Sequence, residues 1–367
     1  MRHFLLRPLT RAAIHPPSVT PHEPLASPGD MAHRILIDTA PGVDDAIALL
    51  LALSSKDLDV VGITTTFGNI DTKRATRNVL SLLELCGRSD LPVAVGAPRA
   101  LSGTRPRYAR HVHGRNGLGG FAFPQPHAKP LPLSAAEFIV RMVMAAPGEL
   151  TLVTFGPLTN LSLALELEPR LGEKVAAVVT LGGALEVPGN VTASAETHLF
   201  NDPPAAARVL AAGWPLTLVG LDVTSQVVMT PAYLQSLRHS GQLTGELIWN
   251  ISRFSEAFHY QHHGLAGLYS HAPTALAYVL APELFTLEES EVHVRTQGPE
   301  RGRTTRQPIP PGLLRRTYRR IPQVCIDVDA ERVLELVRDQ LRPPAASPPV
   351  SLPGQRREPW VMTMSSM

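Results

Sequence analysis

Three carboxylates crowd one short stretch of the sequence, Asp38-Thr-Ala-Pro-Gly-Val-Asp44-Asp45. The apolar residues 35–37 before it predict a buried strand, the Pro-Gly pair predicts a turn, and the apolar run up to Leu53 predicts a helix. An acidic residue suits a helix start because the helix dipole is positive there, so capping explains one or two of the three. Three carboxylates at one strand end favour a cation or sugar hydroxyls as their ligand, with caps plus a turn as the alternative.

The composition limits the classes of protein to which the chain can belong. Its 367 residues, 44% of them hydrophobic, suit one large α/β domain or two smaller ones. The 34 basic and 32 acidic residues leave a net charge of +2, which provides no strong field for attracting nucleic acid or a membrane surface. No apolar run is long enough to span a bilayer. Cys86 and Cys325 lack metal-ligand spacing, which predicts reduced thiols in a cytoplasmic protein.

Short apolar strands alternate with amphipathic helices from Arg34 onward. Further strands are predicted over residues 58–67, 91–95, 150–155, 175–181, 216–221, 285–296 and 323–328, and helices over residues 71–86, 134–146, 159–167, 247–263, 271–280 and 329–341. This alternation predicts a mainly parallel sheet flanked by helices. Ligands of such sheets bind beyond the carboxyl ends of the strands, so Asp38, Asp44, Asp45 and Asn69 are expected to share one edge.

A long connection, residues 96–130, contains the segment His111-Val-His113-Gly-Arg-Asn-Gly-Leu-Gly-Gly and has little periodicity. A loop of this length inside a compact domain is typical of a lid or a binding loop. The two alternating histidines could bind a metal, yet no third ligand follows at metal spacing, which disfavours zinc. The glycines favour a mobile flap over a polar site.

The two ends of the chain and one basic cluster lack a core pattern. Residues 1–33 have arginines before any acidic residue and several prolines, which predicts a disordered extension; a transit peptide or a true start at Met31 are the alternatives. Residues 342–367 are rich in proline and serine and are also predicted to be disordered. The basic residues within 313–320 are interpreted as a solvated loop, with nucleic-acid contact as the less favoured alternative.

Further segments complete a recognisable pattern together with residues 38–45. In chain order they are Thr64-Thr-Thr-Phe-Gly-Asn69, His113-Gly-Arg-Asn-Gly-Leu-Gly119, Gly156-Pro-Leu-Thr-Asn160, Gly182-Gly-Ala184 followed by Gly189-Asn190, Asn201-Asp-Pro203, Gly220-Leu-Asp-Val-Thr224, and His271-Ala-Pro273 leading into Ala277-Tyr278. With these motifs the chain resembles the inosine–uridine-preferring nucleoside hydrolase family over about residues 34–341. The resemblance implies a single α/β domain with a mainly parallel sheet, related to the Rossmann topology.

The resemblance also implies an activity. Members of that family hydrolyse the N-glycosidic bond of ribonucleosides to ribose and a free base, a reaction of purine and pyrimidine nucleoside catabolism. A bound Ca²⁺ holds the attacking water, and carboxylates hold the metal. Carboxylates also stabilise the oxocarbenium-like sugar, and a proton donor helps the nitrogen base to leave. The implied partner is a nucleoside or ribose, and the implied assembly is a homodimer or homotetramer.

The family's residue roles are carried over position by position. Asp45 and the backbone carbonyl of Phe155 correspond to calcium ligands, and Asp38 supports the metal cluster from behind. The positions that correspond to ribose contacts are Asp44, Asn69, Asn190, Glu196 and His198. His271 is implied to lie by the base and to protonate it, so His271 and Asp44 form the implied catalytic pair.

Four positions depart from the family pattern. Ala40 and Ala272 stand where the family has metal-binding aspartates, the first of which is also the general base, while His198 replaces an asparagine and Ser225 a histidine. Because calcium affinity depends on the number of charged ligands, the resemblance predicts doubtful calcium binding and a ribonucleoside N-glycosidase that is weakened or inactive. A non-catalytic ribose or nucleoside binder is the alternative. The sequence leaves both a natural and an engineered origin of the two alanines open.

Overall fold

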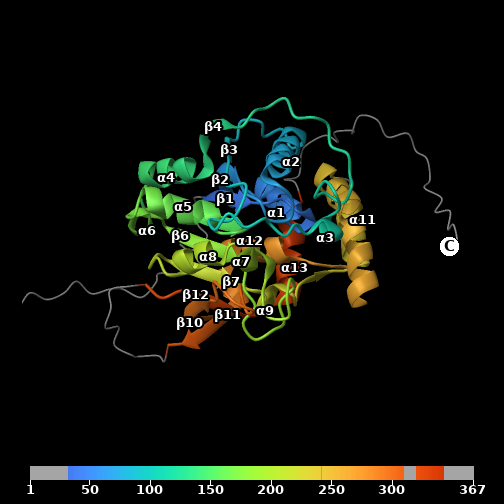
Figure 1. Ribbon diagram of the computed structural model, residues 1–367. Coiled ribbons are helices and arrows are strands. Elements are labelled where there is room, and N and C mark those ends of the chain that lie inside the picture. Colours follow the sequence, from blue (N-terminus) through green and yellow to red (C-terminus); the bar gives the residue numbers. More distant parts are fainter. Residues whose placement is uncertain (1–31, 241, 310–319, 343–367) are drawn as a thin grey trace, which may run out of the picture. The chain divides into compact units, whose positions relative to one another are not determined.

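The computed structural model describes residues 32–240, 242–309 and 320–342. Their centre is a ten-stranded sheet with the order β11-β10-β12-β7-β6-β5-β1-β2-β3-β4 (Figure 1). The strands are β1 (His33–Thr39), β2 (Leu58–Thr65), β3 (Val93–Val95), β4 (Leu131–Ser134), β5 (Thr151–Phe155), β6 (Ala177–Leu181), β7 (Leu216–Val219), β10 (Phe285–Val294), β11 (Thr304–Pro308) and β12 (Gln323–Val328), beside a separate pair, β8 (Val228–Met229) and β9 (Leu268–Tyr269). Neighbouring strands from β12 to β4 are parallel, and β10 and β11 form an antiparallel edge. The predicted α/β domain with a mainly parallel sheet is confirmed.

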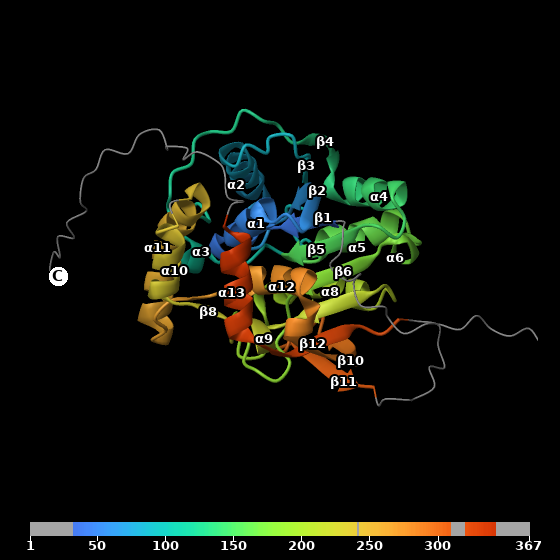
Figure 2. The same ribbon diagram turned by 180° about the vertical axis from the view of Figure 1, so that it is seen from behind.

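Two layers of helices cover the two faces of this sheet (Figures 1 and 2). The helices are α1 (Val43–Ser54), α2 (Thr72–Leu85), α3 (Arg110–His113), α4 (Ala135–Ala145), α5 (Thr159–Leu167), α6 (Leu171–Lys174), α7 (Thr197–Asn201), α8 (Pro203–Leu210), α9 (Leu221–Thr224), α10 (Pro231–Arg238), α11 (Leu243–His263), α12 (His271–Leu280) and α13 (Ala330–Gln340), with a 3-10 turn at Pro282–Leu284. Alternate side chains of a strand point to opposite faces. In β1, Ile35 and Ile37 therefore pack with α1, α2 and α10 to α13, whereas Leu36 packs with α4, α5, α6 and α8.

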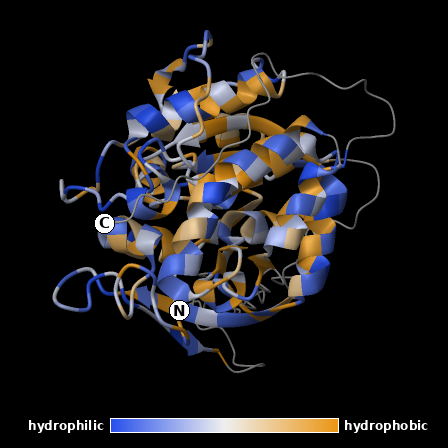
Figure 3. Ribbon diagram, turned by 90° about the vertical axis from the view of Figure 1, so that its right-hand side faces the viewer, coloured by the Kyte–Doolittle hydropathy of each residue, from blue (hydrophilic) through white to orange (hydrophobic). Residues whose placement is uncertain are grey.

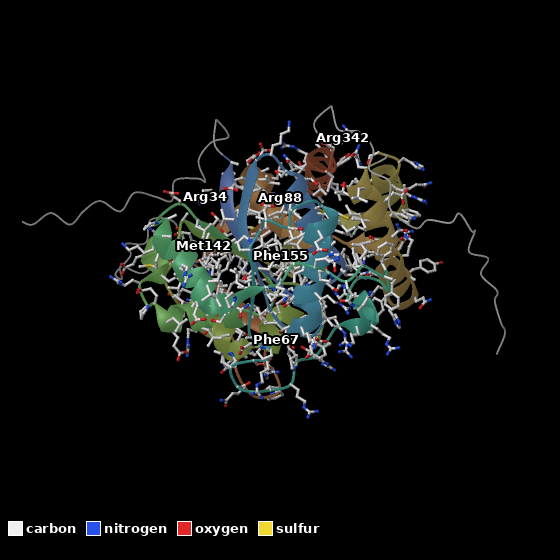
Figure 4. All side chains as sticks on the ribbon, turned by 90° about the horizontal axis from the view of Figure 1, so that it is seen from above. Arg34, Phe67, Arg88, Met142, Phe155 and Arg342 are labelled. Atoms are coloured by element: carbon white, nitrogen blue, oxygen red, sulfur yellow. The ribbon has the colours of Figure 1, made fainter. Side chains whose placement is uncertain are left out.

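The helices are amphipathic, and their apolar sides supply the core. Figure 3 shows blue and orange segments alternating along them, as expected of helices with one buried side. Phe67 and Phe155 are fully buried and lie among densely packed side chains in Figure 4. Within the described ranges, no helix combines the length and the apolar character needed to cross a membrane.

The candidate site lies where the order of the strands reverses, between β5 and β1. Strands β6 and β7 follow on one side of this point and β2, β3 and β4 on the other. Thr39 at the end of β1 pairs in register with Thr65 of β2 and with Phe155 of β5, so these three strands end level with each other. In parallel sheets, ligands bind at such a reversal beyond the carboxyl ends of the strands.

Several predicted boundaries need correction. The strands expected over 58–67, 216–221 and 285–296 end at Thr65, Val219 and Val294, and the helix expected over 247–263 begins at Leu243. After β7, Gly220 begins the short helix α9 instead of continuing the strand. The sequence also misses β4 and β11. Both lie at sheet edges and contain proline and polar residues, which edge strands tolerate because one side makes no ladder hydrogen bonds.

The predicted terminal segments lie almost entirely outside the described residues. His33, which the sequence assigns to the extension 1–33, is instead the first residue of β1. Residues 1–31 of that extension, residues 343–367 of the predicted tail and residues 313–319 of the basic cluster are outside the described ranges.

Candidate active site

Asp38 is held at the end of β1 by side chains from two neighbouring elements. Its Oδ1 accepts hydrogen bonds from Thr64 Oγ1 at 2.6 Å and from Asn160 Nδ2 at 2.7 Å. Its Oδ2 is buried and has no hydrogen-bond partner among the described residues. Burial opposes ionisation more than these two hydrogen bonds favour it, and it raises the pKa of Asp38 to about 6. Asp38 is thus a buried carboxyl group with one unused oxygen.

Asp45 closes the turn at the start of α1. Its Oδ2 accepts hydrogen bonds from the Gly42 amide at 2.7 Å and from Asn69 Nδ2 at 2.6 Å. Capping of α1 therefore accounts for this oxygen, as the alternative interpretation of the sequence expects. Its Oδ1 is buried without a described partner. Burial, together with the charge of Asp44, raises the pKa of Asp45 well above its usual range.

Asp44 lies between the start of α1 and the start of α12. Its Oδ2 accepts a hydrogen bond from the Ala272 amide at 3.3 Å, in the first turn of α12, where the helix dipole favours negative charge. The charge of Asp44 also acts on His113 and His271, where it opposes the effect of burial on their pKa values. The structure therefore brings Asp44 close to the predicted His271.

His271 begins α12, and its ring is fixed on two sides. Its Nδ1 lies 2.8 Å from Thr224 Oγ1, and its ring stacks on Tyr269 with centroids 5.4 Å apart and planes 29° apart. Burial lowers the pKa of His271. Tyr269 also makes an edge contact with the ring of His259, whose pKa is lowered to about 4, chiefly by burial. These imidazoles are therefore neutral donors and acceptors at neutral pH.

His113 reaches the same cluster from the loop 96–130. Its Nδ1 accepts a hydrogen bond from the Val43 amide at 3.1 Å, so in the neutral ring Nε2 carries the proton. Burial lowers the pKa of His113 to about 4. His113 is accordingly a neutral donor at Nε2. The sequence assigns it no role beyond a rejected zinc site.

The segment around His113 is fastened to the domain at several points. Ser255 Oγ of α11 donates to the Val112 carbonyl at 2.7 Å, and Asn78 Nδ2 of α2 donates to the Asn116 carbonyl at 2.8 Å. Gly119 has a positive φ of 63° and approaches the Ile251 carbonyl so closely that a Cβ would lie 2.2 Å from its oxygen. The predicted mobile flap is therefore, around residues 112–119, a loop anchored on α2 and α11.

Glu196 and His198 lie together at the start of α7. Glu196 Oε1 accepts the His198 amide at 2.8 Å, and Oε2 accepts the Leu199 amide at 3.1 Å and the Gly183 amide at 3.2 Å. His198 Nδ1 is 3.3 Å from Glu196 Oε1. Both oxygens of this predicted ribose contact are therefore already occupied by backbone amides.

Asn190, another predicted ribose contact, is exposed. Its Oδ1 accepts hydrogen bonds from the backbone amide and from Oγ1 of Thr197, each at 2.9 Å. The structure ties Asn190 to the start of α7, whereas Asn69 is buried and bound to Asp45. The predicted ribose contacts thus divide between the β1 end and the α7 end of the site.

Residues 35–335 match the model of the family described as inosine-uridine preferring nucleoside hydrolase. The chain belongs to this family. A probable uridine nucleosidase 2 from Arabidopsis thaliana is 40% identical over 320 residues, which cover 84% of this chain and 97% of that protein. The pyrimidine-specific ribonucleoside hydrolase RihA from Citrobacter koseri is 39% identical over 269 residues, which cover 73% of this chain and 86% of that protein.

Solved structures of nucleoside hydrolases share the fold. The plant nucleoside hydrolase PpNRh1 superposes with a TM-score of 0.81 at 35% identity, over 85% of this chain and 99% of that one. The purine-preferring ribonucleoside hydrolase from Gardnerella vaginalis has a TM-score of 0.79 at 30% identity, over 84% of this chain and 98% of that one. Nucleoside hydrolases are enzymes, so the predicted enzyme class is confirmed.

Nucleoside hydrolases depend on a metal, but the residues present here do not fit a calcium ion. Calcium takes about six to eight oxygen ligands, among them several carboxylates. Ala40 and Ala272 are fully buried and offer no side-chain oxygen. At the described strand ends, Asp38 and Asp45 each have one buried carboxylate oxygen without a hydrogen-bond partner, and the carbonyl of Phe155 lies at the end of β5. The described part of the chain contains no group of three or more His, Cys, Asp or Glu residues that could hold a metal ion.

Three residues of the candidate site have no role assigned from the sequence: Asn160, Thr224 and His259. Asn160 and Thr224 come shortly after β5 and β7, so the rule that polar residues gather beyond strand ends identifies both as candidates. His259 lies on the long helix α11, far from any strand end in the sequence. Only the packing of α11 against β9 brings it to Tyr269, and no local signal predicts that contact.

Proposed function

We propose that this chain hydrolyses the N-glycosidic bond of ribonucleosides to ribose and a free base, at the edge formed by β1, β2 and β5. The observation that carries the proposal is the position of Asp44 beside His113 and His271 at the strand-order reversal of a nucleoside hydrolase fold. Relatives named for uridine and for pyrimidine ribonucleosides support this substrate class. We further propose a cytoplasmic homodimer or homotetramer.

The residues of the chain divide the chemistry between acid and base roles. Asp44 is a buried carboxylate that can hold ribose hydroxyls, stabilise the cationic sugar and take the proton of the attacking water. In the tautomer whose Nδ1 accepts from the Thr224 hydroxyl, His271 carries its proton on Nε2 and can donate a hydrogen bond from it to the leaving base. His113 presents a second neutral Nε2–H. Asn69, which is buried beside Asp45, is proposed to complete the sugar contacts at the β1 end.

Turnover is proposed to be slow because Ala40 and Ala272 supply no carboxylates. General-base catalysis contributes about 10²–10⁴-fold in rate, and a metal-bound water adds to that. The same two buried alanines favour a second candidate function, a non-catalytic binder of ribose or nucleosides. In that case Asp44, Asn69 and His271 would hold the ligand without cleaving it.

Chromatography of bases released from uridine, cytidine and inosine tests the two functions against each other. The full chain is incubated with each nucleoside in excess chelator and in millimolar calcium. Base release above the uncatalysed rate supports the hydrolase. A rise in melting temperature with ribose or nucleoside and no release supports the binder, because a ligand of the folded state stabilises it by mass action. Neither release nor a thermal shift contradicts both functions.

A further inference from the structure

A cavity lies among α10, α11 and α13, and its lining shares no residue with the candidate active site. Its volume is about 720 Å³, within the range of small-molecule sites. Figure 2 shows α13 running beside α10 and α11. The lining includes Arg338 and Arg342 of the α13 end and His239 after α10, and no acidic residue is among the described residues that line it. The cavity is therefore a basic pocket on a chain of nearly balanced charge.

Arg338 is the residue that points to a ligand. Its Nε is buried and has no hydrogen-bond partner among the described residues. Its guanidinium carbon lies 5.0 Å from the centroid of the Tyr233 ring, and the Tyr233 hydroxyl donates to the Leu334 carbonyl at 2.7 Å, which fixes the ring. A buried donor without an acceptor is unfavourable, and it is worse for a charged group. An anionic oxygen in the cavity would satisfy this guanidinium.

Two further donors face the same space. Thr230 Oγ1 caps α10 by accepting the Tyr233 amide at 3.2 Å, so its own proton is left for an acceptor in the cavity. Arg342 is mostly exposed, is labelled at the edge of the molecule in Figure 4, and pairs through Nη1 with Asp339 at 3.3 Å. Its other guanidinium N–H groups are available to a ligand. Arg338 in the last turn of α13 and Arg342 just beyond its end both line the cavity.

The two serines of the lining are already satisfied, and much of the remaining lining is apolar. Ser236 and Ser240 donate to the helix carbonyls of Tyr233 and Leu237, so they add no free donor. The larger aliphatic residues that line the cavity are Val228, Leu237, Leu334 and Leu341. Two guanidinium groups and a hydroxyl match the several acceptor oxygens of a phosphate better than the two of a carboxylate.

We propose that this cavity binds a small organic phosphate, with the phosphate on Arg338, Arg342 and Thr230 and an apolar or aromatic body against the four aliphatic residues. Phenyl phosphate is a suitable probe because it has both parts and no ribose. The proposal is independent of nucleoside hydrolysis, because its residues are separate from the candidate active site.

Isothermal titration of the full chain with phenyl phosphate, in buffer free of phosphate and sulfate, tests the proposal. We expect one-to-one binding that saturating ribose leaves unchanged. Phenol and inorganic phosphate should each bind at least about tenfold more weakly, since each lacks one half of the ligand. Arg338→Gln should weaken phenyl phosphate binding at least about tenfold. Arg332→Gln, an exposed arginine earlier on α13 that does not line the cavity, should leave binding unchanged.

Melting temperatures of the variants show whether each is folded, and Arg342→Gln provides a second test if Arg338→Gln does not fold. Absence of phenyl phosphate binding overturns the proposal. Binding that neither arginine substitution weakens also overturns it, because the ligand then lies elsewhere. Inorganic phosphate that binds as tightly as phenyl phosphate overturns the assignment of an organic ligand.

Discussion

Asp45 and Glu196 are both buried carboxyl groups at a helix start near the carboxyl end of the sheet, but they differ in how their oxygens are satisfied. At the α7 end of the site, both oxygens of Glu196 accept backbone amides. At the β1 end, one oxygen of Asp45 and one of Asp38 have no described partner, and burial raises the pKa of both groups. A helix-start acid is therefore not a ligand site by its position alone. The β1 end differs from the α7 end because it has buried carboxylate oxygens without a described hydrogen-bond partner.

The largest expected effect concerns Asp44, which lies at the β1 end with its charge directed at the imidazoles. Asp44→Asn should lower base release from the best nucleoside by about 10²–10⁴-fold, because it removes the proposed base and the charge that stabilises the sugar cation. Initial rates by chromatography measure this loss. Asp59→Asn, at the opposite end of β2 and exposed, is the matched control and should keep full activity. Equal rates for Asp44→Asn and the unaltered chain would remove Asp44 from the mechanism.

The next effect is on stability and depends on pH. Burial raises the pKa of Asp38 to about 6 in the folded chain, from 3.8 for a solvent-exposed aspartate. Between these values the folded state holds a proton that the unfolded state has lost, so the free energy of unfolding falls as pH rises. Above about pH 6 the free energy of unfolding has fallen by the full amount, roughly 3 kcal/mol. Asp38→Asn, which cannot ionise, should therefore be more stable than the unaltered chain by up to roughly this amount near pH 8.

Urea unfolding of both proteins near pH 4.5, 6 and 8 measures this difference. The stability difference between the Asn variant and the unaltered chain should grow with pH across this range. A difference that is constant with pH would mean that Asp38 titrates alike in both states, and that its unused oxygen has no energetic consequence.

The smallest effect is a loss of stability expected at the α7 end, opposite in sign to the gain expected for Asp38→Asn. Three backbone amides donate to the two carboxylate oxygens of Glu196. Glu196→Gln leaves only one acceptor oxygen for them, and it should therefore lower the free energy of unfolding by about 1–2 kcal/mol. Asp329→Asn is the control: Asp329 caps the exposed start of α13, asparagine caps equally well, and stability should change by less than about 0.5 kcal/mol. Urea unfolding near pH 8 measures both. A Glu196→Gln variant as stable as the unaltered chain would erase the contrast between the two ends.

The sequence predicts the sheet and its polar edge because these depend on local patterns. Apolar strands such as 150–155 and 323–328 each specify their element within a few residues. The sequence does not predict the edge strands β4 and β11, because each pairs with a neighbouring strand on one side only.

The site is predictable only in part for a related reason. Asp38 is the next-to-last residue of β1, and Asp44 and Asn69 come shortly after β1 and β2, which marks them in the sequence. Whether an oxygen is used or unused depends on partners more than 20 residues away, such as Asn69 for Asp45 and Asn160 for Asp38. The roles of His113 and His259 likewise depend on the packing of the loop 96–130 and of α11, which no local pattern specifies.

We propose that the β1 edge hydrolyses nucleosides slowly because Ala40 and Ala272 supply no carboxylates there. Turnover of the Ala40→Asp/Ala272→Asp protein in millimolar calcium tests it most directly. The account predicts at least about a hundredfold more base release from at least one nucleoside than with the unaltered chain, and much less from either single substitution, since groups that act as a unit are non-additive. Adding Asp45→Ala to the double variant should abolish the gain. A double variant that binds calcium in a calorimetric titration but hydrolyses no nucleoside would contradict the account.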